Sequence, residues 1–173
     1  MYEYRNAQRD ELPSLKSFLF DQGSNPWNYL PQQGIDSTFE MIANNQAEAL
    51  IACHQQLLIG LAIFLYADHF PDHLIPYAQP ANTLYIAEVV VHRQYTGQGI
   101  GSTLLTHIIN RARSLQACKI IIDRHEENKA SAAMMHKVGF EEVCTFADLG
   151  RRIHGSQNTT ILEIELSQSA LSS

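Results

Sequence analysis

The spacing of apolar and polar residues along the chain predicts a mixed order of helices and strands. Apolar residues three and four positions apart mark one face of a helix, and short apolar runs bounded by turn residues mark strands. Helices are predicted at residues 9–22, 37–44, 99–115 and 128–140. Strands are predicted at residues 2–7, 48–54, 57–67, 83–92, 119–123, 141–149 and 159–167. Because the two kinds of element do not alternate regularly, we expect an α/β fold with a mixed sheet and helices on both faces, not a fully parallel doubly wound sheet.

Residues that cap helices support the predicted boundaries. Asp10 is placed to cap the first helix, because its short polar side chain can accept a hydrogen bond from the first turn. Ser37 and Glu40 have the spacing of a capping box and predict the start of the second helix. Asn128 and Gly139 predict the start and the end of the last helix.

Two segments rich in glycine, proline and asparagine are predicted to be loops. They cover residues 23–34 and 68–82, and the second holds three prolines. Loops of that length in compact domains are often functional. Because no repeat, low-complexity tract or linker interrupts the pattern, residues 1–173 are expected to form a single domain.

The overall charge argues against a nucleic-acid partner. The formal net charge is -6, and lysine and arginine form no cluster of the kind that a phosphate backbone requires. With 45% hydrophobic and 17% charged residues, the composition is that of an ordinary globular protein. The longest apolar run, Leu57–Ala67, is too short to span a bilayer as a helix, so no membrane association is expected.

Cysteine usage and the first residues of the chain predict a cytoplasmic protein. Cys53, Cys118 and Cys144 lie far apart and form no Cys-x-x-Cys pair, which favours a reducing compartment with free thiols. The first residues, MYEYRNAQRDE, contain no apolar core of a signal peptide.

The histidines do not predict a metal site. His69 and His73 lie four apart in the proline-containing loop, and His125 follows Asp123 by two positions. Neither group has a third and a fourth ligand at a recognisable spacing, so no metal is expected.

The stretch TGQGIGSTLL, Thr96–Leu105, places three glycines directly before a predicted helix. Such a loop leaves backbone N–H groups bare at a helix N-terminus, where a phosphate group binds well. The spacing G-x-G-x-G matches neither the dinucleotide fingerprint G-x-G-x-x-G nor the Walker loop, which needs a lysine after its last glycine. On spacing alone, a glycine-rich turn without a ligand is the alternative to a phosphate site.

Two blocks of sequence around this loop resemble the GNAT superfamily of acetyl-CoA-dependent N-acetyltransferases. The first block is VVVHRQYTGQGIGSTLL, in which Tyr95–Gly101 resembles the family pattern Y-R-G-x-G-I-G. The second block, ENKASAAMMHKVGFEEV, resembles N-x-x-A-x-x-x-Y-x-K-x-G-F at Asn128, Ser131, Met135, Lys137, Gly139 and Phe140. The resemblance implies a GNAT-like mixed, mostly antiparallel sheet of about seven strands, splayed at the fourth and fifth strands, with about four helices on both faces.

By that resemblance the co-substrate is acetyl-CoA, and the glycine loop holds its pyrophosphate. Backbone N–H groups of the loop and the dipole of the following helix would face the phosphate oxygens, and the preceding strand would pair with the pantetheine arm. Thr96 stands where the family usually has arginine or glutamine, so one charge-assisted phosphate contact is absent. The residues implied in coenzyme binding are Val89, Val90, Val91, Thr96, Gly97, Gln98, Gly99, Ile100, Gly101, Ser102, Asn128 and Met135.

Glu88 is the candidate general base, because it precedes the V-V-V run of the strand that would lie beside the thioester, where many family members carry a glutamate. Burying an acid in an apolar strand is costly without a purpose or a partner. The alternatives for Glu88 are binding of a cation and pairing with a neighbouring arginine. Met135 stands where the family often has tyrosine, and methionine cannot donate a proton, so the general acid is missing from this position.

The resemblance implies direct transfer, in a ternary complex, to a primary amine of a small molecule or amino acid. The implied acceptor residues are Trp27, Tyr29, Phe70 and Tyr77, with core packing as the alternative for each aromatic ring. Residues 130–155 also resemble the branch that acetylates phosphinothricin and related small amino acids. Two other functions stay open: an acyl-CoA sensor without turnover, and an N-acetyltransferase acting on a protein or peptide. A homodimer is a reasonable expectation for this family.

Overall fold

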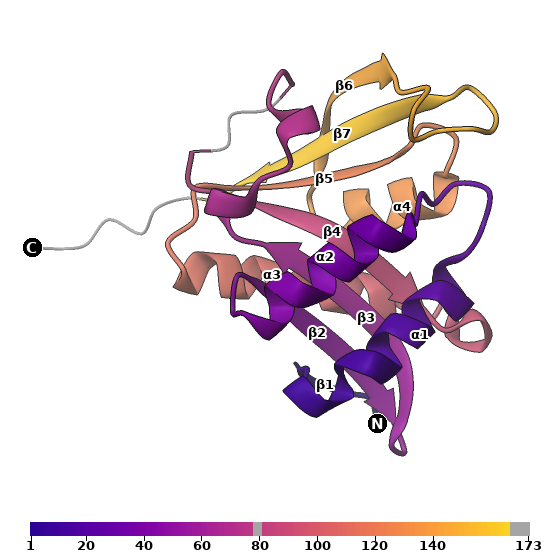
Figure 1. The fold of residues 1–173 in the computed structure, drawn as a ribbon, viewed down its shortest axis with the longest axis vertical. Coiled ribbons are helices and arrows are strands. Elements are labelled where there is room, and N and C mark those ends of the chain that lie inside the picture. Colours follow the sequence, from indigo (N-terminus) through magenta and orange to yellow (C-terminus); the bar gives the residue numbers. More distant parts are fainter. Residues whose placement is uncertain (78–80, 167–173) are drawn as a thin grey trace, which may run out of the picture.

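The computed structural model of the chain describes residues 1–77 and 81–166. One sheet of seven strands runs through it in the order β1-β2-β3-β4-β5-β7-β6 (Figure 1). β4 and β5 are parallel, and the other neighbouring pairs of this described sheet are antiparallel. The strands are β1 (Glu3–Asn6), β2 (Ala47–His54), β3 (Leu57–Leu65), β4 (Thr83–Val91), β5 (Lys119–His125), β6 (Glu141–Ala147) and β7 (Asn158–Glu165). The predicted mixed, mostly antiparallel sheet is confirmed.

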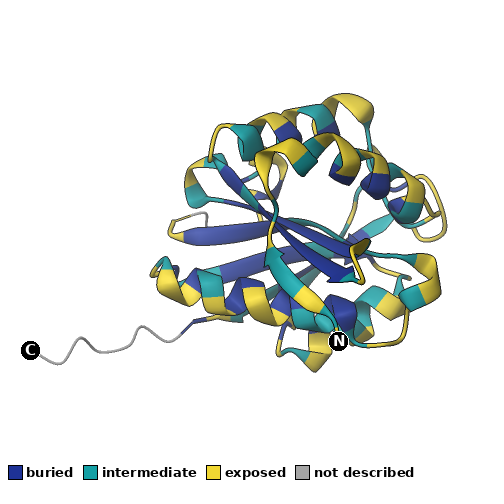
Figure 2. Ribbon diagram, turned by 90° about the horizontal axis from the view of Figure 1, so that it is seen from below, coloured by how far each residue is buried: buried dark blue, intermediate teal, exposed yellow. Residues whose placement is uncertain are grey.

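Helices cover both faces of the sheet, as predicted (Figure 2). One core cluster joins the first two helices to β2 and β3, and a second joins the last two helices to the opposite face of the sheet. The helices are α1 (Leu12–Gly23), α2 (Gln32–Ala43), α3 (Ile100–Ser114) and α4 (Lys129–Lys137). Among residues 1–77 and 81–166, no helix is long and apolar enough to cross a membrane.

The two parallel strands separate along their length, which confirms the predicted splay. β4 pairs with β5 only from Thr83 to Ile86, opposite Lys119 to Ile122. β5 continues beside β7 as far as His125, and β4 continues beside β3 as far as Val91. Beyond Ile86 the two central strands are therefore each paired on one side only, which opens a gap in the middle of the sheet.

A bulge in β4 lies at the start of this gap and decides which way Glu88 points. Ile86 pairs with Phe64, whereas Glu88 pairs with the adjacent Ile63, so Ala87 is the extra residue. Residues directly opposite in an antiparallel pair share a face. Because Ile63 packs against α1 and α2, Glu88 faces that side of the sheet, and the alternation of β4 is shifted by one position after the bulge.

The predicted start of α2 at Ser37 is wrong, because the helix begins at Gln32. Pro31 precedes it in an extended conformation, with the fixed φ that proline brings to a helix start. Ile35 and Phe39, four residues apart, bury one face against the core. Burial of this face extends α2 by more than a turn toward the N-terminus, so the apparent capping box at Ser37 lies inside the helix.

The predicted cap at Asp10 is also wrong. A single 3₁₀ turn, Arg9–Glu11, precedes α1, and Gln8 is the residue before it. The backbone N–H of Gln8 donates to the Glu11 carboxylate at 2.7 Å, and Arg5 donates to the same carboxylate at 2.8 and 2.6 Å. A pairing with Arg5, which lies on β1, therefore decides where this helical segment begins.

The predicted loop at residues 68–82 contains two short 3₁₀ turns, Ala67–His69 and Asp72–Leu74, and its residues 78–80 lie outside the described part of the chain. Leu74 has no exposed surface and anchors the second turn in a core cluster with β2, β3, β4, β5 and β7 residues. This loop therefore packs against the sheet, on the face that carries α1 and α2.

Candidate active site

A groove of 590 Å³ lies where β4 and β5 separate. Its walls are the end of β4, the glycine-rich loop, the start of α3, one side of α4 and the segment that follows α1. Ten of the residues predicted from the sequence line it together, and they are Val89, Val90, Val91, Thr96, Gly97, Gly99, Ile100, Gly101, Ser102 and Asn128. The structure thus brings most of the predicted coenzyme residues to one cavity.

The glycine loop has a backbone that other residues adopt only with strain. Gly97 and Gly99 have φ values of 78° and 79°, in the left-handed region, and Gly99 is the N-cap of α3. The N–H of Thr103 donates to the carbonyl oxygen of Gly99 at 2.9 Å. The amides of the preceding helical turn have no carbonyl behind them within the helix, so they form the kind of site that binds a phosphate group.

Gly101 allows α3 and α4 to approach each other at the floor of the groove. A Cβ atom at Gly101 would lie 2.4 Å from Sδ of Met134 and 3.6 Å from Val91. Close approach of α4, not an unusual φ, therefore explains the third glycine of the loop.

The side chains of Thr96 and Gln98 are turned to neighbouring protein groups. Oγ1 of Thr96 donates to the carbonyl oxygen of Arg93 at 3.0 Å. The hydroxyl group of Tyr2 donates to the side-chain oxygen of Gln98, and Gln98 does not line the groove. The side chain of Gln98 is thus directed away from the groove, and the prediction that its backbone N–H faces the phosphate stays a prediction.

Met135 does not reach the groove either. Its side chain is 4% exposed and packs in the core cluster beneath α3 and α4. Met134 and Lys137, one position before and two positions after it, line the groove instead. The side chain of Met135 is buried because the apolar face of α4 packs against the sheet, and its predicted part in coenzyme binding stays a prediction.

Two cations line the groove, and the sequence pattern did not single them out as ligands. Arg93 lies in the short turn before the glycine loop, and Lys137 lies in the last turn of α4. Both residues are exposed. They offer an anionic ligand in the groove the positive charge that Thr96, an uncharged residue, does not supply.

Asn128 caps α4, as predicted. Its side-chain oxygen accepts a hydrogen bond from the N–H of Ser131 at 3.1 Å. Both residues line the groove, so the cap fixes the wall that α4 contributes.

Glu88 is half-buried, and no hydrogen bond from a described residue reaches its carboxyl group. Burial raises its pKa to about 8, and the negative charge of Asp123 adds to this effect, while Arg151 and Arg152 oppose it. Glu88 does not itself line the 590 Å³ groove, although the next residue, Val89, does. The carboxyl group lies on the α1 and α2 side of the splayed strand, where it can hold or release a proton near neutral pH.

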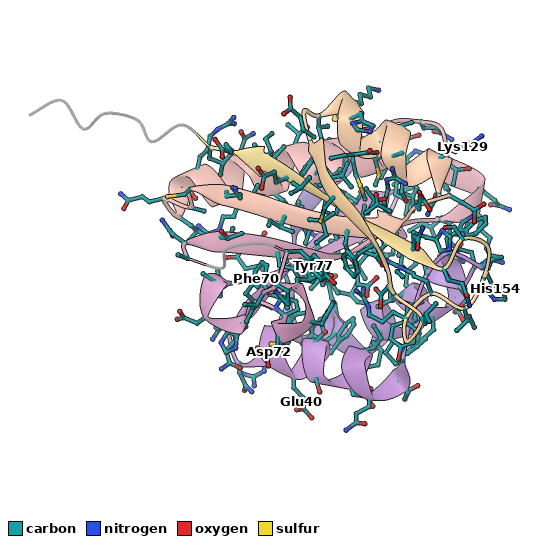
Figure 3. The ribbon with its side chains drawn as sticks, turned by 90° about the horizontal axis from the view of Figure 1, so that it is seen from above. Glu40, Phe70, Asp72, Tyr77, Lys129 and His154 are labelled. Atoms are coloured by element: carbon teal, nitrogen blue, oxygen red, sulfur yellow. The ribbon has the colours of Figure 1, made fainter. Side chains whose placement is uncertain are left out.

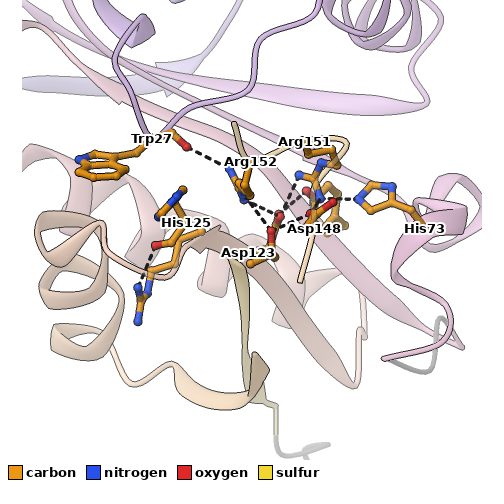
Figure 4. Close-up of polar contacts among 10 residues, drawn as sticks. Trp27, His73, Asp123, His125, Asp148, Arg151 and Arg152 are labelled. Carbon is orange, nitrogen blue, oxygen red and sulfur yellow. Dashed lines mark hydrogen bonds and ion pairs between the residues drawn. The ribbon is translucent and has the colours of Figure 1, made fainter. Parts of the chain in front are cut away.

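The sequence did not predict the cluster of buried charges around Asp123 that Figure 4 shows. The Asp123 side chain, 4% exposed, accepts hydrogen bonds from the Tyr85 hydroxyl at 2.5 Å, Arg151 at 2.9 Å and Arg152 at 3.1 Å. Burial acts to raise the pKa of Asp123, but the two arginines outweigh it and hold that pKa below its usual range. Asp123 is thus ionised and fully paired, in contrast to Glu88.

Two of the predicted acceptor residues serve to anchor a loop. The ring of Phe70 is 7% exposed and packs edge-on against Tyr85 at 6.1 Å. Tyr77 stacks on Phe146 of β6 with centroids 3.8 Å apart. Both rings lie on the segment between β3 and β4 (Figure 3), and neither lines the groove, so their acceptor role stays a prediction.

The other two predicted acceptor residues lie between α1 and α2. Trp27 packs on the ring of His125 with centroids 4.6 Å apart, and Tyr29 is 42% exposed. Neither lines the groove, whereas Asn25 and Asn28 from the same segment do. The predicted acceptor role of Trp27 and Tyr29 stays a prediction, and of their segment it is the asparagines that line the groove.

No group of three or more metal-ligating side chains occurs among residues 1–77 and 81–166.

Comparison with known proteins places this chain in a family. A family model described as the Acetyltransferase (GNAT) family matches residues 12–140. No curated protein sequence shows a significant match. The fold is similar to an N-acetyltransferase from Staphylococcus aureus Mu50, with 20% identity over 96% of this chain and 99% of that one and a TM-score of 0.77.

Two further solved structures show the same likeness. The protein yncA of Salmonella typhimurium, solved with its cofactor acetyl-CoA, is 17% identical over 100% of this chain and 98% of its own, with a TM-score of 0.76. A ribosomal-protein-alanine N-acetyltransferase from Brucella melitensis is 21% identical over 95% of this chain and 99% of its own, with a TM-score of 0.75. At these identities the likeness shows the fold alone.

Proposed function

The chain belongs to the GNAT family of acetyltransferases, and on that premise we propose that it is an N-acetyltransferase that moves the acetyl group of acetyl-CoA to a primary amine of a small molecule or an amino acid. The observation that carries the proposal is the groove between the splayed strands, with a phosphate-binding helix start at one end and the unpaired carboxyl group of Glu88 beside it. The reaction is a direct transfer from the thioester to the amine within one ternary complex.

The groove fits acetyl-CoA in its chemistry. The left-handed glycines and the helix start offer N–H groups to the pyrophosphate, and Arg93 and Lys137 offer positive charge. Val89, Val90 and Val91 have no strand partner on the β5 side, so their backbone groups can pair with the amides of the pantetheine arm. The bound thioester supplies an activated acyl group, and the protein supplies binding, alignment and control of the proton.

Glu88 is the proposed general base. The attacking amine must be neutral, and a carboxylate with a pKa of about 8 is basic enough to take its proton near neutral pH. A bond forms between the amine nitrogen and the acyl carbon, and the bond from that carbon to sulfur breaks. The leaving thiolate, whose own pKa is about 8.5, can take its proton from water, so the absence of a tyrosine at Met135 does not forbid turnover.

The acceptor is proposed to enter from the face that carries Glu88, beside the loop between α1 and α2. The asparagines of that loop line the groove, and they suit a small polar amine. The N-terminus of a peptide is the second candidate, supported by the likeness in fold to a ribosomal-protein-alanine N-acetyltransferase.

Titration calorimetry followed by a thiol-release assay tests the proposal. Acetyl-CoA is titrated into the protein, and pools of alkyl amines, amino acids and alanine-terminated peptides are then added separately. Binding together with thiol release in one pool supports a transferase and names its acceptor class. Binding without release in any pool would favour an acyl-CoA sensor, and absence of binding would contradict the proposal.

A further inference from the structure

Trp27, in the loop between α1 and α2, is held from two sides. Its backbone carbonyl oxygen accepts a hydrogen bond from Nη1 of Arg152 at 3.0 Å, and its ring packs on His125. His125 accepts a hydrogen bond at Nδ1 from the N–H of Glu127, so its Nε2 carries the proton and donates to the carbonyl oxygen of His154 at 2.8 Å. Arg152 and His154 both belong to the segment between β6 and β7, so this segment holds Trp27 directly through Arg152 and indirectly through His125.

Arg152 is the centre of this arrangement. Its side chain is 6% exposed, and its guanidinium group contacts three separate segments. Nε donates to Oγ1 of Thr159 at 2.8 Å, and Nη2 donates to Asp123 at 3.1 Å, in addition to the bond to Trp27 (Figure 4). The planar group thus joins β5, β7 and the loop between α1 and α2 in one fixed geometry.

The position of Trp27 determines where two groove residues lie. The side-chain oxygen of Asn25 accepts hydrogen bonds from the N–H groups of Trp27 at 2.8 Å and Asn28 at 3.0 Å. Asn28 in turn donates to the carbonyl oxygen of Gly23 at the end of α1. Asn25 and Asn28 line the groove, so a displacement of Trp27 moves the wall of the groove with it.

We propose that Arg152 is a positioning residue for the acceptor: by holding the carbonyl group of Trp27, it fixes Asn25 and Asn28 at the reaction end of the groove. This inference rests on the proposed function, because it names the protein group that shapes the acceptor site of the same groove. Arg152 does not line the groove. Its guanidinium group pairs with Asp123, and its positive charge also lowers the pKa of Glu88, so the hydrogen bond to Trp27 has to be tested apart from the charge.

Trp27 is the only tryptophan of the chain, so its fluorescence reports on this link directly. Arg152→Met keeps the length of the side chain but removes the donor to Trp27. We expect a red shift of the emission and stronger quenching by acrylamide. Arg111→Met is the matched control. Arg111, in the last turn of α3, donates hydrogen bonds to Glu48 on β2, and their loss should leave the Trp27 emission unchanged.

Arg152→Lys separates positioning from stability. A lysine keeps the charge beside Asp123 but cannot donate to Trp27, Thr159 and Asp123 together in a fixed fork. We expect the melting temperature of Arg152→Lys to lie closer to that of the wild type than the melting temperature of Arg152→Met does. Its Trp27 emission should shift as it does in Arg152→Met. If Arg152→Met fails to fold, the lysine variant decides the fluorescence test alone.

Kinetics with the best amine of the three pools complete the test. In Arg152→Lys, which keeps the positive charge that acts on Glu88, loss of the hydrogen bond to Trp27 is expected to raise the KM for the amine by about tenfold, with kcat and the affinity for acetyl-CoA little changed. Unchanged Trp27 fluorescence in both variants, or an unchanged KM for the amine, would overturn the inference. Failure of the proposed function is seen separately, as absence of acetyl-CoA binding or of thiol release by the wild-type protein, and the fluorescence then still decides whether Arg152 holds Trp27.

Discussion

Replacement of Glu88 by glutamine removes the titratable carboxyl group beside the groove while keeping its size. With a pKa of about 8, this group is ionised in about one tenth of the molecules at pH 7 and in about nine tenths at pH 9. If the carboxylate is the base, kcat of the wild-type enzyme rises about tenfold over that interval. Glu88→Gln should lower kcat by about 10²–10⁴-fold and should remove the inflection near pH 8.

The assay is thiol release at saturating acetyl-CoA and amine, measured from pH 6 to pH 10. The amine also titrates, but its contribution persists in the variant and can be subtracted. Glu40→Gln is the control, because Glu40 is an exposed carboxylate on α2 (Figure 3) and its replacement changes the net charge equally.

Either of two results would refute the reasoning about Glu88. The first is an inflection near pH 8 that survives in Glu88→Gln, which would assign that titration to another group. The second is a kcat within about twofold of the wild type, which is far less than the loss of a general base produces.

Three further predictions follow from the same structure. Gly99→Ala should weaken acetyl-CoA binding, measured by calorimetry, and cost about 1–2 kcal/mol of stability, measured by thermal unfolding, because Gly99 has a φ of 79°. Gly150→Ala is the control and should change neither quantity, because a Cβ atom there meets open space. Asn128→Ala should lower the free energy of unfolding by about 1 kcal/mol through loss of the cap on α4, and an unchanged melting curve would contradict this. Because the pKa of Glu88 is raised from 4.5 to about 8 on folding, the folded state binds the extra proton and stability falls as pH rises toward 8. Denaturant unfolding should show a loss of about 1–3 kcal/mol between pH 6 and pH 9 that is absent in Glu88→Gln.

The glycine loop and its helix could be predicted from the sequence because local chemistry determines them. Gly97 and Gly99 adopt the left-handed backbone that their lack of a Cβ atom allows, and Asn128 caps α4 through a hydrogen bond three residues away. The position of Glu88 next to the V-V-V run was also visible. Its orientation was not, because a bulge set by pairing with β3 turns it toward α1 and α2.

Contacts between distant segments explain what the sequence did not reveal. Arg152 and Trp27 are 125 positions apart and join only when the sheet is complete. Arg5 on β1 shapes the start of α1, which is why a cap at Asp10 was a wrong prediction. Met135 occupies a position of the family motif, yet the burial of one face of α4 directs Met134 and Lys137, not Met135, to the groove.

The most direct test of the central claim is to follow an isotopically labelled acetyl group from acetyl-CoA by mass spectrometry. We expect the label to appear on the nitrogen of one amine class, in equal amount to the free coenzyme A released, and Glu88→Gln to slow both equally. Appearance of the label only as acetate, or release of coenzyme A with no labelled amine in any pool, would contradict an N-acetyltransferase.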